Sequence, residues 1–101
     1  MYESIEFTKV PGKVKNRDVT ILALSTCGFC KRALTYLSDN DVAYRYAYVD
    51  KVDPETKQSI IDEFKAKYHE RPRYPTIILD NDEYEIGFKP SSWAARLGLD
   101  A

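Results

Sequence analysis

The only cysteines of the 101-residue chain are Cys27 and Cys30, and Gly28 and Phe29 separate them. Two thiols at this spacing can form a reversible disulfide, and a thiolate can attack a disulfide in another molecule. Cys27 lies where a predicted strand ends and a helix begins. Because the N–H groups and the dipole of a helix N-terminus stabilise an anion, we predict a nucleophilic thiolate at Cys27. Cys30, one helical turn later, can then resolve a mixed disulfide on Cys27.

Three other interpretations of the pair compete with this chemistry. A disulfide between Cys27 and Cys30 closes a very short loop and stabilises by only about 2 kcal/mol, against about 3 for a 15-residue loop. A zinc site takes four ligands, and beyond the two thiolates the chain offers only His69 and carboxylates. Buried, inert cysteines disagree with Gly28, which indicates an exposed loop open to close approach. We therefore predict redox chemistry, with no metal site and no tightly bound cofactor.

The elements that position the cysteines follow from hydrophobic periodicity. An almost unbroken apolar run over residues 19–24 predicts a central strand that is covered on both faces. Ala33, Leu34 and Leu37 share a helical face, which predicts a first helix that starts at the cysteines. Residues 42–49 alternate, with their tyrosines on one side, which predicts a second strand and completes a β-α-β unit.

The rest of the chain predicts a helix, a hairpin and a final helix. Asp53 is a good N-cap and Pro54 suits the first helical position, so a second helix is expected over residues 54–69. Residues 76–79 and 83–88, joined by a polar turn, are typical of a β-hairpin. A short helix over residues 91–97 completes the chain.

The N-terminal part predicts one more strand. Residues 4–10 alternate loosely before the turn Pro11-Gly12, which favours a short edge strand in an N-terminal extension, residues 1–18. The length suits one domain, residues 1–101, of the α/β class.

Charge and hydropathy exclude several partners. Fifteen Lys and Arg against sixteen Asp and Glu leave a net charge of −1, with a pI near 5.8, so no strong field attracts nucleic acid or anionic lipid. No run approaches the roughly 18 apolar residues that span a bilayer, and the N-terminus lacks the basic and apolar regions of a signal peptide. We predict a cytoplasmic protein that binds neither nucleic acid nor membranes.

Three motifs resemble those of glutaredoxins, members of the thioredoxin superfamily. They are Thr26-Cys27-Gly28-Phe29-Cys30, Tyr74-Pro75-Thr76 and Gly87-Phe88-Lys89-Pro90. The resemblance implies a thioredoxin-like mixed sheet of four strands plus the extra N-terminal strand, flanked by three helices. It also implies a nucleophilic Cys27, a resolving Cys30 and a cis peptide bond between Tyr74 and Pro75. The implied function is thiol–disulfide oxidoreduction, in which an electron carrier reduces protein or glutathione mixed disulfides.

Departures from the family pattern bear on the electron donor. Thioredoxins carry a buried acid where this chain has Ile21, and glutaredoxins that use glutathione usually carry a lysine where it has Leu24. The segment at residues 87–90 is closer to that of glutaredoxin-like hydrogen donors of ribonucleotide reductase, which a thioredoxin reductase commonly recharges. The expected reductant is therefore glutathione or a donor of the thioredoxin-reductase type.

Residues beside the cysteines are the candidates for substrate binding. Phe29 and Tyr74 are expected to form an apolar platform, and in the family the backbone of the residue before the cis proline pairs with substrate. Arg73 could bind a carboxylate of glutathione or an acidic partner, although a solvated loop arginine is the plainer interpretation. The predicted substrate-binding set is Phe29, Arg73, Tyr74, Pro75, Gly87 and Phe88.

The expected partners are disulfide-containing proteins, and the chain is expected to be a monomer. A second hypothesis from another functional class stays open, because some glutaredoxins hold a [2Fe–2S] cluster between two monomers. In that case Cys27 and an external thiol such as glutathione would bind the cluster.

Overall fold

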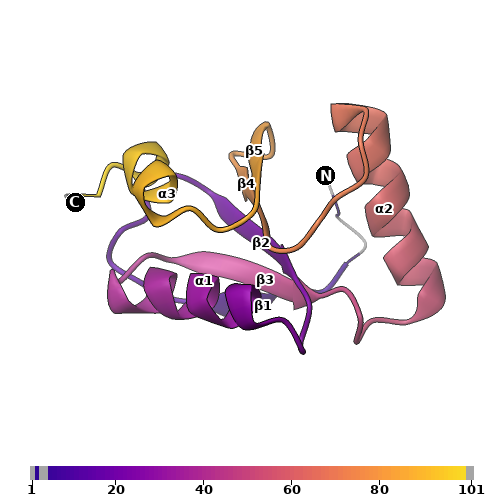
Figure 1. Cartoon of the computed structure of the whole chain (residues 1–101), viewed down its shortest axis with the longest axis horizontal. Coiled ribbons are helices and arrows are strands. Elements are labelled where there is room, and N and C mark those ends of the chain that lie inside the picture. Colours follow the sequence, from indigo (N-terminus) through magenta and orange to yellow (C-terminus); the bar gives the residue numbers. More distant parts are fainter. Residues whose placement is uncertain (1, 3–4, 100–101) are drawn as a thin grey trace.

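The central strand predicted from the sequence is β2 (Val19–Ala23), which lies in the middle of a five-stranded sheet in the computed structural model (Figure 1). The structure describes residues 2 and 5–99. The other elements are β1 (Thr8–Val10), α1 (Gly28–Asp39), β3 (Tyr44–Tyr48), α2 (Pro54–Tyr68), β4 (Thr76–Leu79), β5 (Glu83–Ile86) and α3 (Pro90–Leu97). Their order confirms the predicted succession of strands and helices.

The sheet is mixed, with the strand order β1-β3-β2-β4-β5. Strands β2 and β3 run parallel, and each of the other neighbouring pairs is antiparallel. Every residue of β2 is buried, as expected for a strand covered on both faces. Leu22 pairs with Thr76, so the start of β4 lies beside the end of β2, where the chain continues to the cysteines.

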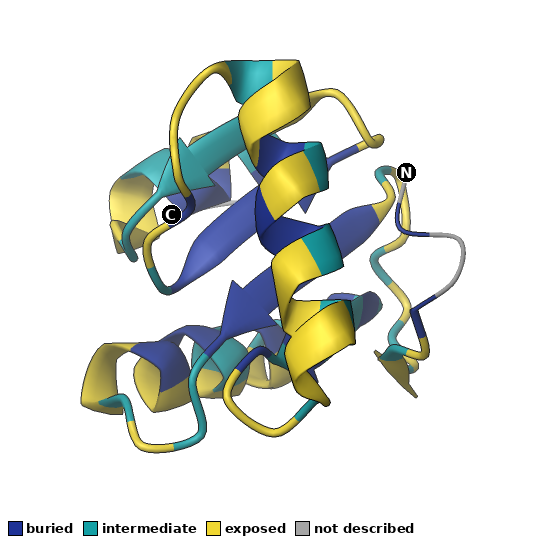
Figure 2. Ribbon diagram, turned by 90° about the vertical axis from the view of Figure 1, so that its right-hand side faces the viewer, coloured by how far each residue is buried: buried dark blue, intermediate teal, exposed yellow. Residues whose placement is uncertain are grey.

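Helices cover both faces of the sheet (Figures 1 and 2). On one face, α1 and α3 bury Leu37 and Trp93 in a core that includes Ile21. On the other face, α2 buries Ile60 and Phe64 against the other side of the sheet. Figure 2 shows the helices with their buried stripes turned toward the strands and their exposed stripes outward. Each helix is therefore held by one apolar face, as its sequence pattern predicts.

The N-terminal strand is shorter than predicted. It covers only Thr8–Val10, which pair antiparallel with β3, and residue 4 of the predicted strand lies outside the described residues. Ile5 is buried together with Tyr2 in the core beneath α2. The backbone N–H of Tyr2 donates to Glu63 Oε2 at 3.0 Å. The apolar side chains before β1 are thus buried by tertiary packing rather than by strand pairing.

The last strand also ends earlier than predicted, at Ile86 rather than residue 88. Gly87 adopts a φ of +91°, which an extended strand cannot accommodate and which glycine tolerates best. The chain therefore turns, and Phe88 packs on Trp93 with ring centroids 5.0 Å apart. At the end of α2, His69 is an exposed residue in the left-handed conformation.

Gly12 lies against backbone and gives a first testable prediction. A Cβ at this position would meet Asp41 O at 2.5 Å, Val42 C at 2.5 Å and Ala43 N at 2.6 Å. We expect Gly12→Ala to lower the free energy of unfolding by about 1–3 kcal/mol, measured by urea denaturation, because backbone cannot move aside as a side chain can. Gly28→Ala is the matched control, since a Cβ there meets nothing within 4 Å. An equal loss in both variants would contradict the packing argument.

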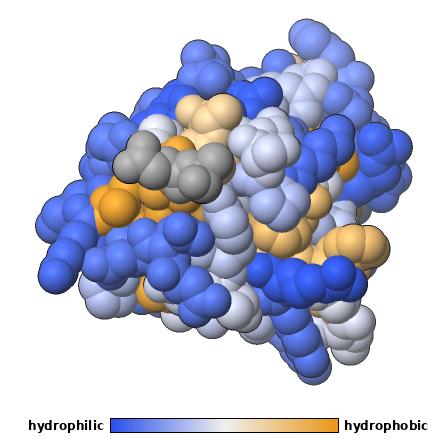
Figure 3. All heavy atoms as spheres, turned by 60° about the vertical axis from the view of Figure 1, so that its left-hand side comes forward, coloured by the Kyte–Doolittle hydropathy of each residue, from blue (hydrophilic) through white to orange (hydrophobic). Residues whose placement is uncertain are grey.

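Within the described residues, no helix is long and apolar enough to cross a membrane. The end of the molecule next to α3 is mostly hydrophilic, and its apolar surface is divided into separate patches (Figure 3).

Candidate active site

Cys27 is the N-cap of α1, at the end of the loop that follows β2. Its Sγ accepts a hydrogen bond from the backbone N–H of Cys30 at 3.2 Å, and its side chain is half-buried. A sulfur in this position satisfies one of the unpaired N–H groups of the first helical turn. The same N–H group and the helix dipole stabilise negative charge on that sulfur. Both cysteines are free thiols in the structure.

Cys30 has the opposite environment. It is fully buried in the core between α1 and the sheet, and the backbone N–H of Leu24 lies 3.5 Å from its Sγ. Burial, and next its contact with Cys27, raise the pKa of the Cys30 thiol to about 12. The sequence-based expectation of an exposed loop therefore holds for Gly28 and Phe29, whereas Cys30 lies inside the core. The two sulfurs are thus inequivalent, one open to attack and one protected.

This difference predicts a pH-dependent alkylation pattern. A raised pKa means that Cys30 stays a thiol at neutral pH and becomes a thiolate only as the pH rises past about 9 toward 12. Iodoacetamide reacts with the thiolate, and at pH 8 burial keeps Cys30 almost entirely in the thiol form. In folded Cys27→Ser protein we therefore expect almost no adduct on Cys30 at pH 8, measured by mass spectrometry, and a rising rate above pH 9.

The matched control is the same variant unfolded in urea, where burial no longer protects the thiol. We expect alkylation there to be faster by at least about a hundredfold at pH 8. Equal rates in the folded and unfolded states would show that the fold does not protect Cys30.

A second contact holds the loop before Cys27. The carboxylate of Asp50, just after β3, accepts from the Ser25 N–H at 2.9 Å and from Ser25 Oγ at 2.5 Å. These hydrogen bonds hold the pKa of Asp50 below its usual range. Sequence reasoning missed this pair. The available signal was the position of Asp50 directly after a strand parallel to β2, since the carboxyl ends of parallel strands meet at one edge of the sheet.

The loop before β4 contains the predicted proline feature. The Tyr74–Pro75 peptide bond is cis, as the family resemblance implies. Pro75 immediately precedes Thr76, whose partner in β2 is Leu22, so this loop lies at the edge of the sheet from which the chain runs to Cys27. The N–H of Gly87 donates to the carbonyl of Pro75 at 2.8 Å. Segments far apart in the sequence thus meet beside the cysteine loop.

Gly87 is in turn fixed by α3. Trp93 is completely buried, and its Nε1–H donates to the Gly87 carbonyl at 3.2 Å. Phe88 is half-buried and lies between Trp93 and Tyr36, with a ring-centroid distance of 5.5 Å to the latter. The structure therefore joins Pro75, Gly87 and Phe88 in one packed unit, and it places much of the Phe88 side chain in the core.

The remaining candidates for substrate binding differ in exposure. Phe29 is 60 % exposed, and the guanidinium of Arg32 lies 4.7 Å from its ring centroid. Tyr74 is half-buried between the two cores, whereas Arg73 is exposed and uses its carbonyl to accept from the Thr76 hydroxyl. The aromatic contacts of the described residues include none between Phe29 and Tyr74.

Solved structures share this architecture. The glutaredoxin of Methanosarcina mazei Go1 superposes with a TM-score of 0.80 and 27% sequence identity, covering 94% of this chain and 90% of that chain. Methanoredoxin of Methanosarcina acetivorans superposes with a TM-score of 0.74 and 29% sequence identity, covering 81% of this chain and 85% of that chain. A dithiolic glutaredoxin of Trypanosoma brucei brucei shares the fold. Its TM-score is 0.62 and its sequence identity 24%, with 84% of each chain covered. The α/β fold predicted from the sequence is therefore the thioredoxin-like fold of glutaredoxins.

Sequence comparison extends the similarity to the family. Comparison with curated protein sequences finds no match. The sequence model of the glutaredoxin family matches residues 19–84, which include the cysteine pair, the cis proline and the strands from β2 to β4, and it ends within β5. This region is more than half of the chain. The chain belongs to the glutaredoxin family.

Proposed function

We propose that this protein is a dithiol thiol–disulfide oxidoreductase in which Cys27 is the nucleophile and Cys30 the resolving thiol. Membership of the glutaredoxin family supports thiol–disulfide chemistry in general. The observation that carries the dithiol mechanism is the contrast between the two sulfurs. Cys27 Sγ accepts an N–H at the start of α1, and Cys30 is fully buried as a neutral thiol one turn later.

The proposed reaction has two balanced steps. First, the Cys27 thiolate attacks one sulfur of the substrate disulfide, forms a mixed disulfide with it and releases the other sulfur as a thiolate, which takes up a proton. Second, Cys30 loses its proton and attacks Cys27 Sγ, which releases the second substrate thiol and leaves a Cys27–Cys30 disulfide. The substrate gains two electrons from the protein and two protons, one released by Cys30 and one taken up from solvent.

Deprotonation of Cys30 only in the second step suits its environment. The raised pKa of Cys30 keeps it a poor nucleophile while Cys27 reacts, so a mixed disulfide forms before an internal one. Once Cys27 Sγ is bonded to the substrate sulfur, Cys27 no longer carries a negative charge. Its hydrogen bond from the Cys30 N–H is then weaker. The buried thiol then attacks a neighbour one helical turn away.

Substrate binding is proposed to use the surface around Cys27. The exposed ring of Phe29 offers apolar contact, and the exposed guanidinium of Arg73 offers charge-assisted hydrogen bonds to a carboxylate. The backbone of Tyr74 is proposed to pair with an extended substrate segment, while Pro75, Gly87 and Phe88 hold that loop in place. Disulfide-containing proteins are the proposed partners of a monomeric carrier.

The donor that restores the dithiol is proposed to be glutathione or a thioredoxin-reductase-type enzyme. The decisive comparison measures NADPH oxidation during reduction of one model disulfide, first with glutathione and its reductase and then with a thioredoxin reductase. Turnover in one arm identifies the donor. If neither arm reduces the disulfide and dithiothreitol-reduced protein also fails in single turnover, the proposed function is wrong.

A further inference from the structure

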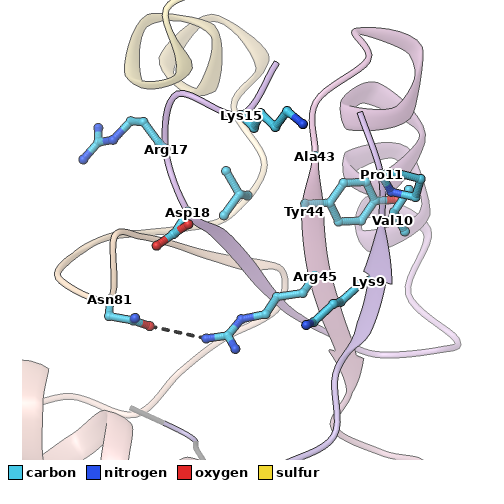
Figure 4. A pocket seen from close by; sticks show the side chains of 11 residues that line it. Lys9, Val10, Pro11, Lys15, Arg17, Asp18, Ala43, Tyr44, Arg45 and Asn81 are labelled. Atoms are coloured by element: carbon cyan, nitrogen blue, oxygen red, sulfur yellow. Dashed lines mark hydrogen bonds between the residues drawn. The ribbon is translucent and has the colours of Figure 1, made fainter. Parts of the chain in front are cut away.

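A cavity lies at the end of the sheet opposite the cysteines. It is lined by Asp18 and Val19, at the start of β2, and by Tyr44, at the start of the parallel strand β3, whereas the cysteines follow the end of β2 (Figure 4). Its volume of about 540 Å³ falls within the range of small-molecule sites, roughly 300–1,000 Å³. The cavity is remote from the proposed redox site, so a ligand here would serve another purpose.

The lining side chains divide between the two faces of the sheet. Val10, Val19 and Tyr44 belong to the core under α1 and α3, and the Tyr44 hydroxyl lies 3.1 Å from Ser38 Oγ in α1. Arg45 follows Tyr44 in β3 and therefore points to the other face, where it contacts Phe7. A ligand on the Arg45 side does not reach the apolar side chains of the opposite face.

Arg45 reaches the cavity as a fixed cation. Its side chain is half-buried, and its guanidinium lies 4.5 Å from the ring centroid of Phe7. Nε donates to Thr20 Oγ1 at 2.8 Å, and Nη2 donates to Asn81 Oδ1 at 3.4 Å. All these contacts are neutral, so they orient the guanidinium without balancing its charge.

The other half-buried arginines of the described residues are balanced. Arg17 Nη2 lies 2.8 Å from Asp80 Oδ2 and also contacts Glu83, and Arg96 Nε lies 2.8 Å from Glu85 Oε1. Within the part of the chain that the structure describes, Arg45 is the one half-buried arginine that contacts no carboxylate. Because removing a charge from water is costly without an opposite charge, an oriented and unbalanced guanidinium points to an external anion.

Two lysines add to this positive field. The strand register places Lys9 directly opposite Arg45, an arrangement of like charges that destabilises a sheet unless an anion screens it. Lys15 extends over the cavity from the segment between β1 and β2 (Figure 4). Asp18 is the one carboxylate in the lining, and the charge of Arg17 is already satisfied by Asp80 and Glu83. Three cations thus face a single carboxylate.

We propose that this cavity binds a small oxyanion, a phosphate or carboxylate group, at Arg45. The forked donors of Arg45 match the two oxygens of such a group, and Lys9 and Lys15 supply further charge-assisted hydrogen bonds. Neither the net charge nor the cysteine chemistry indicates this site, because it arises where three segments meet.

The test is an NMR titration of the folded, ¹⁵N-labelled protein with phenyl phosphate. We expect saturable shifts of amides around Val10, Val19 and Arg45, with a dissociation constant of about 1 mM or lower. Benzoate, as the carboxylate arm, shows which oxyanion is preferred. Phenol, which lacks the charge, should bind at least about tenfold more weakly.

Variants of exposed lysines keep the test free of folding effects. Lys9→Ala and Lys15→Ala should each weaken phenyl phosphate binding about fivefold, and Lys13→Ala, an exposed lysine outside the lining, is the matched control. Arg45→Lys keeps the positive charge but removes the paired donors of the guanidinium. It should also weaken phenyl phosphate binding about fivefold. Equal binding of phenol, an equal effect of Lys13→Ala, shifts confined to other residues or no saturation by about 10 mM would overturn the proposal.

Discussion

Replacing Cys27 by serine is expected to lower the rate of disulfide reduction by at least about a thousandfold, since a hydroxyl at this position is a far weaker nucleophile than a thiolate. Replacing Cys30 by serine has a different expected result. The first step still occurs in Cys30→Ser, because Cys27 keeps its place as the N-cap of α1. The resolving step is lost, so a mixed disulfide on Cys27 accumulates.

The two variants are measured with one protein disulfide substrate. Single-turnover release of the substrate thiol reports the first step, and intact mass spectrometry without reductant reports the covalent adduct. Cys27→Ser should form no adduct, and Cys30→Ser should form one adduct per chain that dithiothreitol removes. Full activity of Cys27→Ser, or an adduct on Cys30 in that variant, would exclude the proposed order of attack.

Trp93→Ala is expected to have the largest effect on stability. Trp93 is completely buried between α3 and the sheet, contacts Phe88 with ring centroids 5.0 Å apart and donates to the Gly87 carbonyl. Truncation of a buried aromatic residue to alanine typically costs about 3–5 kcal/mol, a large share of the 5–15 kcal/mol that stabilises an ordinary domain. Urea unfolding followed by far-UV circular dichroism measures the loss.

Trp93→Phe separates packing from the hydrogen bond. It keeps most of the apolar volume but leaves the Gly87 carbonyl without its donor, so we expect a smaller loss of about 1–3 kcal/mol. Because Gly87 binds the carbonyl of Pro75, this variant should also weaken substrate binding more than the resolving step. A Trp93→Ala protein as stable as the unmodified chain would show that α3 is not anchored through this residue.

Much of the fold could be predicted because its signals are local. The apolar run at residues 19–24 needs burial on both faces, and β2 indeed has no exposed residue. Asp53 and Pro54 predict a helix start from their own chemistry, and Asp53 caps α2 through the Thr56 N–H at 2.7 Å. Where the prediction of element bounds was wrong, at Ile5 and at Gly87, distant contacts decided the conformation.

The candidate site was predictable only in part for the same reason. The spacing of Cys27 and Cys30 at a strand-to-helix junction is a local pattern, and it was enough to predict a nucleophile at the N-cap. The burial of Cys30 depends on how α1 packs on the sheet, and the Ser25–Asp50 contact joins residues 25 positions apart. Both features depend on how distant segments pack, although the position of Asp50 after a strand parallel to β2 was a signal for the second.

The sequence by itself determined the order of elements, the position of the thiols at the start of a helix and the resemblance to glutaredoxins. Those properties depend on residue type and spacing along a few turns or strands, where side chains interact with their own backbone. The tertiary structure alone decided which sulfur is buried, how Gly87 and Trp93 support the proline loop, and that Lys9 faces Arg45 across two strands. These depend on register and packing between distant segments, whose free energy is defined only once the whole core has formed.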